Sequence, residues 1–267
     1  MSVRQALEFD QENGNNKWQE AMKKEIAQLV ALNCFTFHAS NYIPDADSQE
    51  AKFGYLKKYK TKQLIIDSKP MKIDPAMFNP EDPDASFDPD FLNEYPDAGE
   101  ERDPQEPAAF GTELETSILF DANHGHNKRT RHSISGILVY IGSTLVLWSA
   151  ERQGFIATST YSAEFMAMRT GVEEAISIRY MLRSLGVPVT KPTHMFGDNM
   201  SVIKTASLVN SELKKKHIAI SYHMVREAVA GRVVCLIWCN THENWADICT
   251  KSLGGNAFHA ILDKNML

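Results

Sequence analysis

The stretch YSAEFMAMRTGVEEAISIRYMLRSL, residues 161–185, predicts the longest helix of the chain. Its buried face is expected to carry four apolar residues at helical spacing from Glu164, namely Met168, Val172, Ala175 and Leu182. Gly186 and Pro188 follow and are typical of a helix end, because glycine forms a left-handed cap and proline cannot continue a helix. A helix of this kind needs an apolar surface to pack on.

Short apolar segments on both sides of this helix predict that surface. Three strands precede the helix, at 116–122 (TSILFDA), 132–142 (HSISGILVYIG) and 144–152 (TLVLWSAER). The short link at Gly142-Ser143 indicates an antiparallel meander. Strands at 193–197 and 233–239 follow, together with helices at about 199–209 and 218–230 and a last helix from Asn244. This order predicts an α/β domain with a mixed five-stranded sheet and helices on both faces.

The chain before this domain has a different composition. Residues 70–107 hold eight of its eleven prolines, and the stretch from Asp74 to Glu106 has twelve acids against one base. We therefore expect 70–110 to be an acidic, Pro-rich, extended and solvated linker that precedes a domain over 111–267. Outside the acidic stretch the chain carries 27 bases and 22 acids, so its net charge of −6 does not exclude a polyanionic partner.

Composition also argues against several classes of protein. No run reaches the roughly 18 apolar residues of a membrane helix, and the N-terminus is too polar for a signal peptide, which predicts an intracellular protein, cytoplasmic or nuclear. Four cysteines in 267 residues do not form a disulfide framework. Cys235, Cys239, His242 and Cys249 superficially suggest zinc, but we interpret the cysteines as small buried hydrophobes.

Four carboxylates stand at predicted strand or helix ends, where functional groups of α/β sheets collect: Asp121, Glu164, Asp198 and Asp247. Asp121 ends an apolar strand, so it needs hydrogen bonds or a cation to offset its desolvation. Asp198 also fits a helix N-cap, and Asp247 also fits the first turn of a helix capped by Asn244. A purely structural role therefore stays open for these two.

If these carboxylates converge, their mutual repulsion would raise some of their pKa values unless divalent cations neutralise them. Oxygen ligands favour Mg²⁺ or Mn²⁺ over zinc. Two such ions about 3.5–4 Å apart would activate a water and stabilise the leaving oxygen in an in-line attack on a phosphodiester. The acidic set therefore predicts hydrolysis of a nucleic-acid backbone.

Several sequence blocks resemble the ribonuclease H domain of copia-type LTR retrotransposon polyproteins, in the family's order: FDAN with TRHSISG (120–136), LWSAERQ (147–153), STYSAEFMAMRTGVEEAISIRYMLRSLG (159–186), MFGDNMSV (195–202), KKHIAISYHMVREAV (215–229) and NWADICTKSL (244–253). The resemblance implies an RNase H-like fold, two Mg²⁺ or Mn²⁺ ions, and endonucleolytic cleavage of the RNA strand of RNA–DNA hybrids. It places the catalytic, metal-binding acids at Asp121, Glu164, Asp198 and Asp247. It does not require histidine at position 242, so His242 is either a proton donor to the product or a solvated loop residue.

Residues 1–69 resemble remnants of the reverse transcriptase that precedes this domain in the family. KWQEAMKKEIAQLVALNCFTF (17–37) is similar to its opening and FGYLKKYKTKQLIIDSK (53–69) to its connection region. Only residues 38–52 separate the two blocks, where the family carries the fingers and palm. No Asp-Asp pair occurs in the chain, so polymerase activity is not expected.

Contacts to a nucleic acid are expected from scattered groups: Arg129, Arg131, Lys214–Lys216, Asn199 and Ser201. The charged members of this set also fit an ordinary solvated surface. A second function stays open, namely a catalytically silent retroelement relic or a nucleic-acid-binding module of the same fold. The sequence identifies no protein partner.

Overall fold

The computed structural model describes residues 89–100, 102, 104, 106–125, 129–213, 216–253, 258, 260 and 261. The predicted reverse transcriptase remnant at 1–69 and the linker up to residue 88 lie outside the described residues, as do Lys214 and Lys215.

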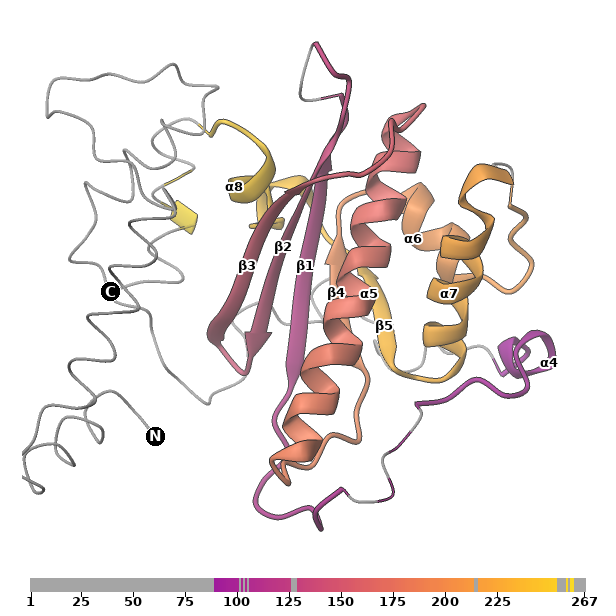
Figure 1. Ribbon diagram of the computed structural model, residues 1–267, viewed down its shortest axis with the longest axis vertical. Coiled ribbons are helices and arrows are strands. Elements are labelled where there is room, and N and C mark those ends of the chain that lie inside the picture. Colours follow the sequence, from indigo (N-terminus) through magenta and orange to yellow (C-terminus); the bar gives the residue numbers. More distant parts are fainter. Residues whose placement is uncertain are drawn as a thin grey trace, which may run out of the picture. The chain divides into compact units, whose positions relative to one another are not determined.

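A mixed five-stranded sheet forms the centre of the described region (Figure 1). Its strands are β1 (Thr116–Asn123), β2 (Ile134–Ile141), β3 (Thr144–Arg152), β4 (Thr193–Gly197) and β5 (Val234–Trp238). They lie in the order β3-β2-β1-β4-β5. The first three form the predicted antiparallel meander, and β4 and β5 add parallel to β1. The predicted fold class is confirmed.

Helices cover both faces of this sheet, as expected. On one face lie α5 (Thr160–Ser184), α6 (Met200–Ser207) and α7 (Ala219–Ala230), the last preceded by a short 3₁₀ helix at Lys216–Ile218. The opposite face carries α8 (Asp247–Thr250), which follows a 3₁₀ turn at Thr241–Glu243 (Figure 1). None of the described helices combines the length and hydropathy of a membrane-spanning segment.

The long helix α5 begins and ends where the sequence predicts, within one residue. The Ser159 hydroxyl accepts a hydrogen bond from the Ser162 amide (3.2 Å) and caps its N-terminus. At its C-terminus Gly186 has a φ of 76°, a left-handed conformation that glycine adopts without strain. The Val187 amide then donates to the Leu182 carbonyl (2.9 Å), which ends the helix.

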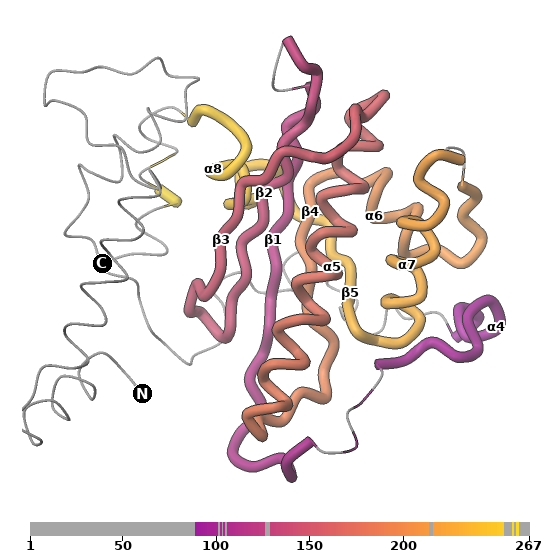
Figure 2. Tube along the Cα trace, in the orientation of Figure 1, coloured from indigo at the N-terminus to yellow at the C-terminus, as the bar shows by residue number. Residues whose placement is uncertain are grey.

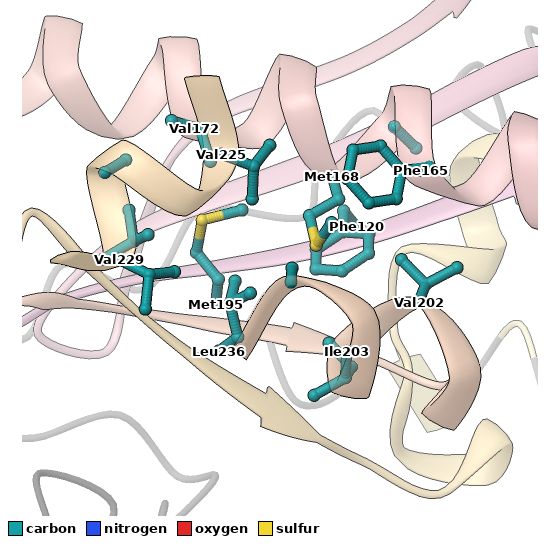
Figure 3. Packing of buried hydrophobic residues seen from close by; sticks show 14 of the residues in the cluster. Phe120, Phe165, Met168, Val172, Met195, Val202, Ile203, Val225, Val229 and Leu236 are labelled. Carbon is teal, nitrogen blue, oxygen red and sulfur yellow. The ribbon is translucent and has the colours of Figure 1, made fainter. Parts of the chain in front are cut away.

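The main core lies between the sheet and the three helices on its first face (Figure 3). Phe120 and Met195 extend from β1 and β4 towards Phe165 and Met168 of α5, while Val225 of α7 closes the other side. All five side chains are at most 1% exposed. Because side chains alternate along a strand, Leu119 and Asp121 point to the opposite face, which carries α8.

The approach of α8 to the sheet depends on Gly136 of β2, which pairs with Asp121 of β1. A β-carbon at Gly136 would lie 2.6 Å from Thr250 Cγ2 and 2.8 Å from Cys249 Cβ, closer than packed atoms come. The absent side chain therefore lets α8 lie directly over the end of β1.

Residues 89–100 pack on the domain instead of forming the expected solvated linker. This segment includes α4 (Phe91–Glu94), which lies beside α7 (Figure 2). Phe91 is fully buried, with its ring 4.6 Å from the guanidinium of Arg226, and Glu94 forms an ion pair with the same arginine. Glu100 accepts two hydrogen bonds from Arg179 of α5, at 2.7 and 2.8 Å. The expectation was wrong for this stretch because Phe91 is buried and Glu94 and Glu100 pair with buried arginines, a pairing that composition does not reveal.

Candidate active site

Two of the four predicted carboxylates meet because β1 and β4 are parallel neighbours. Leu119 pairs with Phe196 in the register of these strands. Asp121 and Asp198 each lie two residues further along, so they are level with one another at the carboxyl ends of these two strands. Asp121 is fully buried and Asp198 is half-buried.

The third carboxylate of the group, Asp247, belongs to α8 on the opposite face of the sheet from α5. Asp247 begins α8 and is 8% exposed. Asp121, Asp198 and Asp247 each offer an oxygen, and these oxygens all lie within 4.8 Å of one another. A group of three converging carboxylates is a donor set that suits Mg²⁺ or Mn²⁺, so the residues fit the predicted metal.

Glu164 lies outside that group of three but interacts with it electrostatically. It sits in the first turns of α5 and is 6% exposed. Burial and the charges of Asp121 and Asp198 raise the pKa of Glu164 to about 9. Similarly, burial and the charge of Asp121 raise the pKa of Asp247 to about 6. Burial is the larger cause for both groups and repulsion between the carboxylates adds to it, and a bound divalent cation would relieve both effects.

Two residues of the cluster were missed by the sequence analysis, Thr250 and Lys251. The Thr250 hydroxyl donates to Asp121 Oδ2. The Lys251 ammonium lies 2.6 Å from Asp247 Oδ1 and 3.2 Å from Asp121 Oδ1. These two aspartates outweigh the effect of burial and raise the pKa of Lys251 above its usual value. One signal was available: Lys251 follows Asp247 by four residues, the spacing of an ion pair along a helix.

Hydrogen bonds hold the elements that carry the acids. The buried Asn244 side chain donates to the Phe120 carbonyl (2.9 Å), and Asn123 donates to the Thr250 carbonyl (2.9 Å), so both tie β1 to the α8 region. The Trp238 indole donates to the main-chain carbonyl of Asp198 (2.9 Å) and joins the ends of β4 and β5. The carboxylates therefore stand on a rigid frame.

The structure removes the helix-cap interpretation of Asp198 and changes the one expected around Asp247. The N-cap of α6 is Asn199, whose side chain accepts from the Val202 amide (3.3 Å), and so Asp198 is not the cap. Asn244 accepts from the Ala246 amide (3.3 Å) without capping α8 itself, since α8 starts after Ala246 and has no side-chain cap. Asp247 does lie in the first turn of α8, so an interaction with the positive helix terminus stays open for it.

The other candidate residues lie around the cluster or away from it. His242 is exposed in the 3₁₀ turn before Asp247, and its role stays a prediction. Arg129, Arg131 and Lys216 are exposed, as their predicted phosphate contacts require. The three described cysteines are buried in the apolar cluster that includes residues of the sheet and of α8: Cys235, Cys239 and Cys249. Burial and the nearby aspartates raise the pKa of Cys239 to about 12, so its thiol stays protonated.

A separate cleft of about 670 Å³ lies at the opposite end of β4. Its lining includes Glu100, which forms ion pairs with both Arg179 and Arg183. No carboxylate of the acidic cluster lines it. The cleft is therefore separate from the candidate site.

Comparison with known proteins places the chain beside transposon polyproteins. No family model matches it. It is 29% identical over 154 residues to the retrovirus-related Pol polyprotein from transposon RE1 of Arabidopsis thaliana, a match that covers 58% of this chain and 10% of the relative. It is also 29% identical over 138 residues to that from transposon TNT 1-94 of Nicotiana tabacum, which covers 52% of this chain and 10% of the relative. The chain thus spans about a tenth of the length of these relatives.

Among solved structures, the N-terminal RNase H domain of Rv2228c from Mycobacterium tuberculosis is similar at 15% identity with a TM-score of 0.40. The match covers 56% of this chain and 97% of that one. The relatives are Pol polyproteins of copia-type transposons, as the sequence motifs indicate.

Proposed function

We propose that this relative of copia-type Pol polyproteins carries a ribonuclease H that cleaves the RNA strand of RNA–DNA hybrids, endonucleolytically and with two divalent ions. The observation that carries the proposal is the convergence of Asp121, Asp198 and Asp247 within 4.8 Å, beside a Glu164 whose pKa is raised to about 9. Buried carboxylates that repel one another destabilise a fold, and the single ammonium of Lys251 is shared between Asp121 and Asp247, so the cluster is better explained by function than by stability.

Each carboxylate has a distinct part in the proposed reaction. Asp121 and Asp198, level at the edge of the sheet, would hold Mg²⁺ or Mn²⁺, Glu164 would ligate and orient, and Asp247 would complete the second site. When bound, the two ions would supply an activated water and a stabilised leaving oxygen for in-line attack on the phosphodiester. Thr250 orients Asp121 through its hydroxyl. The RNA strand would be distinguished by its 2′-hydroxyls and by the shape of the hybrid.

Cleavage of a labelled RNA–DNA hybrid by the full chain tests this function, with duplex DNA and duplex RNA as controls. We expect cutting of the RNA strand only with Mg²⁺ or Mn²⁺. The Asp198→Asn variant should lower the rate by roughly two orders of magnitude or more, since an isosteric amide removes the ligand charge. Asp97→Asn, at an exposed acid of the 89–100 segment, should leave the rate unchanged.

A folded protein that cuts no hybrid with either metal would contradict the enzyme. That result would favour the alternative of a silent relic or a nucleic-acid-binding module. A titration of the protein with hybrid would then distinguish the two, because only the binding module should bind it. Polymerase activity is not part of the proposal.

A further inference from the structure

Lys251 links two of the clustered aspartates through one ammonium group. Its Nζ lies 2.6 Å from Asp247 Oδ1 and 3.2 Å from Asp121 Oδ1. Asp121 is fully buried, and its other oxygen, Oδ2, accepts the hydroxyl hydrogen of Thr250. Both oxygens of Asp121 are therefore engaged by the protein itself, and its charge is offset by Lys251.

The ammonium engages the same carboxylate oxygens that a divalent ion would use. A metal ion bound between Asp121 and Asp247 would lie within about 2–2.6 Å of their oxygens. An ammonium that stayed in hydrogen-bond contact with these oxygens would then lie close to two further positive charges, in a poorly hydrated site where repulsion is strong. The two cations therefore exclude one another at this pair of aspartates.

The position of Lys251 in the fold allows it to leave. It follows α8 as the C-cap residue with an extended backbone (φ −121°, ψ 149°). Its side chain is 37% exposed, whereas that of Asp121 is 0% exposed. The long flexible side chain can rotate into solvent while Asp121 and the core stay in place.

We propose that Lys251 is a built-in competitor of the divalent ion: it neutralises Asp121 and Asp247 in the metal-free protein and must be displaced before these aspartates bind metal. The inference rests on the proposed function, because it concerns the same carboxylates. Lys251 is a positioning residue that holds the cluster assembled before metal binds. It also sets the concentration of divalent ion at which the cluster loads.

Binding of Mn²⁺ alone, without nucleic acid, tests the competition. Electron paramagnetic resonance of free Mn²⁺ gives its Kd for wild type and for Lys251→Met, which keeps an unbranched side chain one atom shorter than lysine and removes its charge. We expect the variant to bind at least about tenfold more tightly, because the ion no longer displaces two charge-assisted hydrogen bonds. Lys251→Arg, which keeps the charge, should bind no more tightly than wild type.

Lys191→Met is the matched control. Lys191 forms a 3.3 Å ion pair with Glu115 at the other end of the sheet, so its loss should leave the Kd for Mn²⁺ unchanged. Equal or weaker Mn²⁺ binding by Lys251→Met would overturn the proposal, and so would the absence of Mn²⁺ binding in both proteins.

Chemical denaturation provides a second readout if Lys251→Met folds poorly without metal. The neutral variant Lys251→Gln should be less stable than wild type in EDTA and should gain more stability from added Mg²⁺, since tighter binding stabilises more at a given concentration. An equal gain in both proteins would contradict the competition. These readouts use no substrate, so they test Lys251 separately from the nuclease activity. If the chain binds Mn²⁺ as expected but cuts no hybrid, the proposed nuclease activity is refuted and the proposed role of Lys251 stands.

Discussion

Replacing Glu164 with glutamine should stabilise the metal-free protein at neutral pH. Burial and the charges of Asp121 and Asp198 raise the pKa of Glu164 to about 9, against 4.5 for an ordinary glutamate. Between these two values the folded protein keeps a proton that the unfolded chain has released, so the free energy of unfolding falls as pH rises. At about 1.4 kcal/mol per pH unit the penalty at pH 7 is about 3 kcal/mol. Glutamine has nearly the same side-chain shape as glutamate but does not titrate, so Glu164→Gln should not lose this free energy of unfolding.

Urea denaturation in EDTA at about pH 5, 7 and 8 measures the effect. Wild type and Glu164→Gln should differ by less than about 1 kcal/mol at pH 5, and the variant should become more stable by about 3 kcal/mol at pH 7. Some decline between pH 4 and pH 6 should remain in the variant, because burial and the charge of Asp121 raise the pKa of Asp247 to about 6 and both persist in the variant. Saturating Mg²⁺ should stabilise wild type more than the variant, which lacks one of the proposed ligands.

Two results would refute this reasoning. One is a wild type whose stability in EDTA does not fall between pH 5 and pH 8. The other is an equal gain from Glu227→Gln, since Glu227 is an exposed glutamate on α7 and its replacement should change little.

Two further changes test how the domain is assembled. Phe91→Ala should lower the free energy of unfolding by about 3–5 kcal/mol in urea denaturation, whereas Leu92→Ala, at a position 44% exposed in the same helix, should cost less than about 1 kcal/mol. Equal effects would show that α4 does not pack on the domain. Gly136→Ala should cost about 1–3 kcal/mol and weaken Mn²⁺ binding, because its β-carbon would lie 2.6 Å from Thr250 Cγ2 and displace α8. Gly154→Ala, with no atom within 4 Å, is the control, and an unchanged Kd for Gly136→Ala would contradict the role given to this contact.

The sequence by itself determined the elements of the domain and the residue types of its site. Apolar periodicity located α5 and the strands, because burial repeats at 3.6 or 2 residues along a helix or strand wherever one face meets a core. It also identified Asp121 as a carboxylate without a local partner. These signals are local in the chain, so they survive without any knowledge of the fold.

Only the tertiary structure decided which charges meet. The parallel pairing of β1 with β4 sets Asp121 level with Asp198, and the missing side chain of Gly136 lets α8 bring Asp247 and Lys251 to them. The same limit explains the acidic segment before the sheet, whose composition indicates solvation although Glu94 and Glu100 pair with buried arginines. Electrostatic pairing depends on distance in space, and strand order and helix packing bring together residues that lie far apart in the chain, such as Asp121 and Lys251, 130 positions apart.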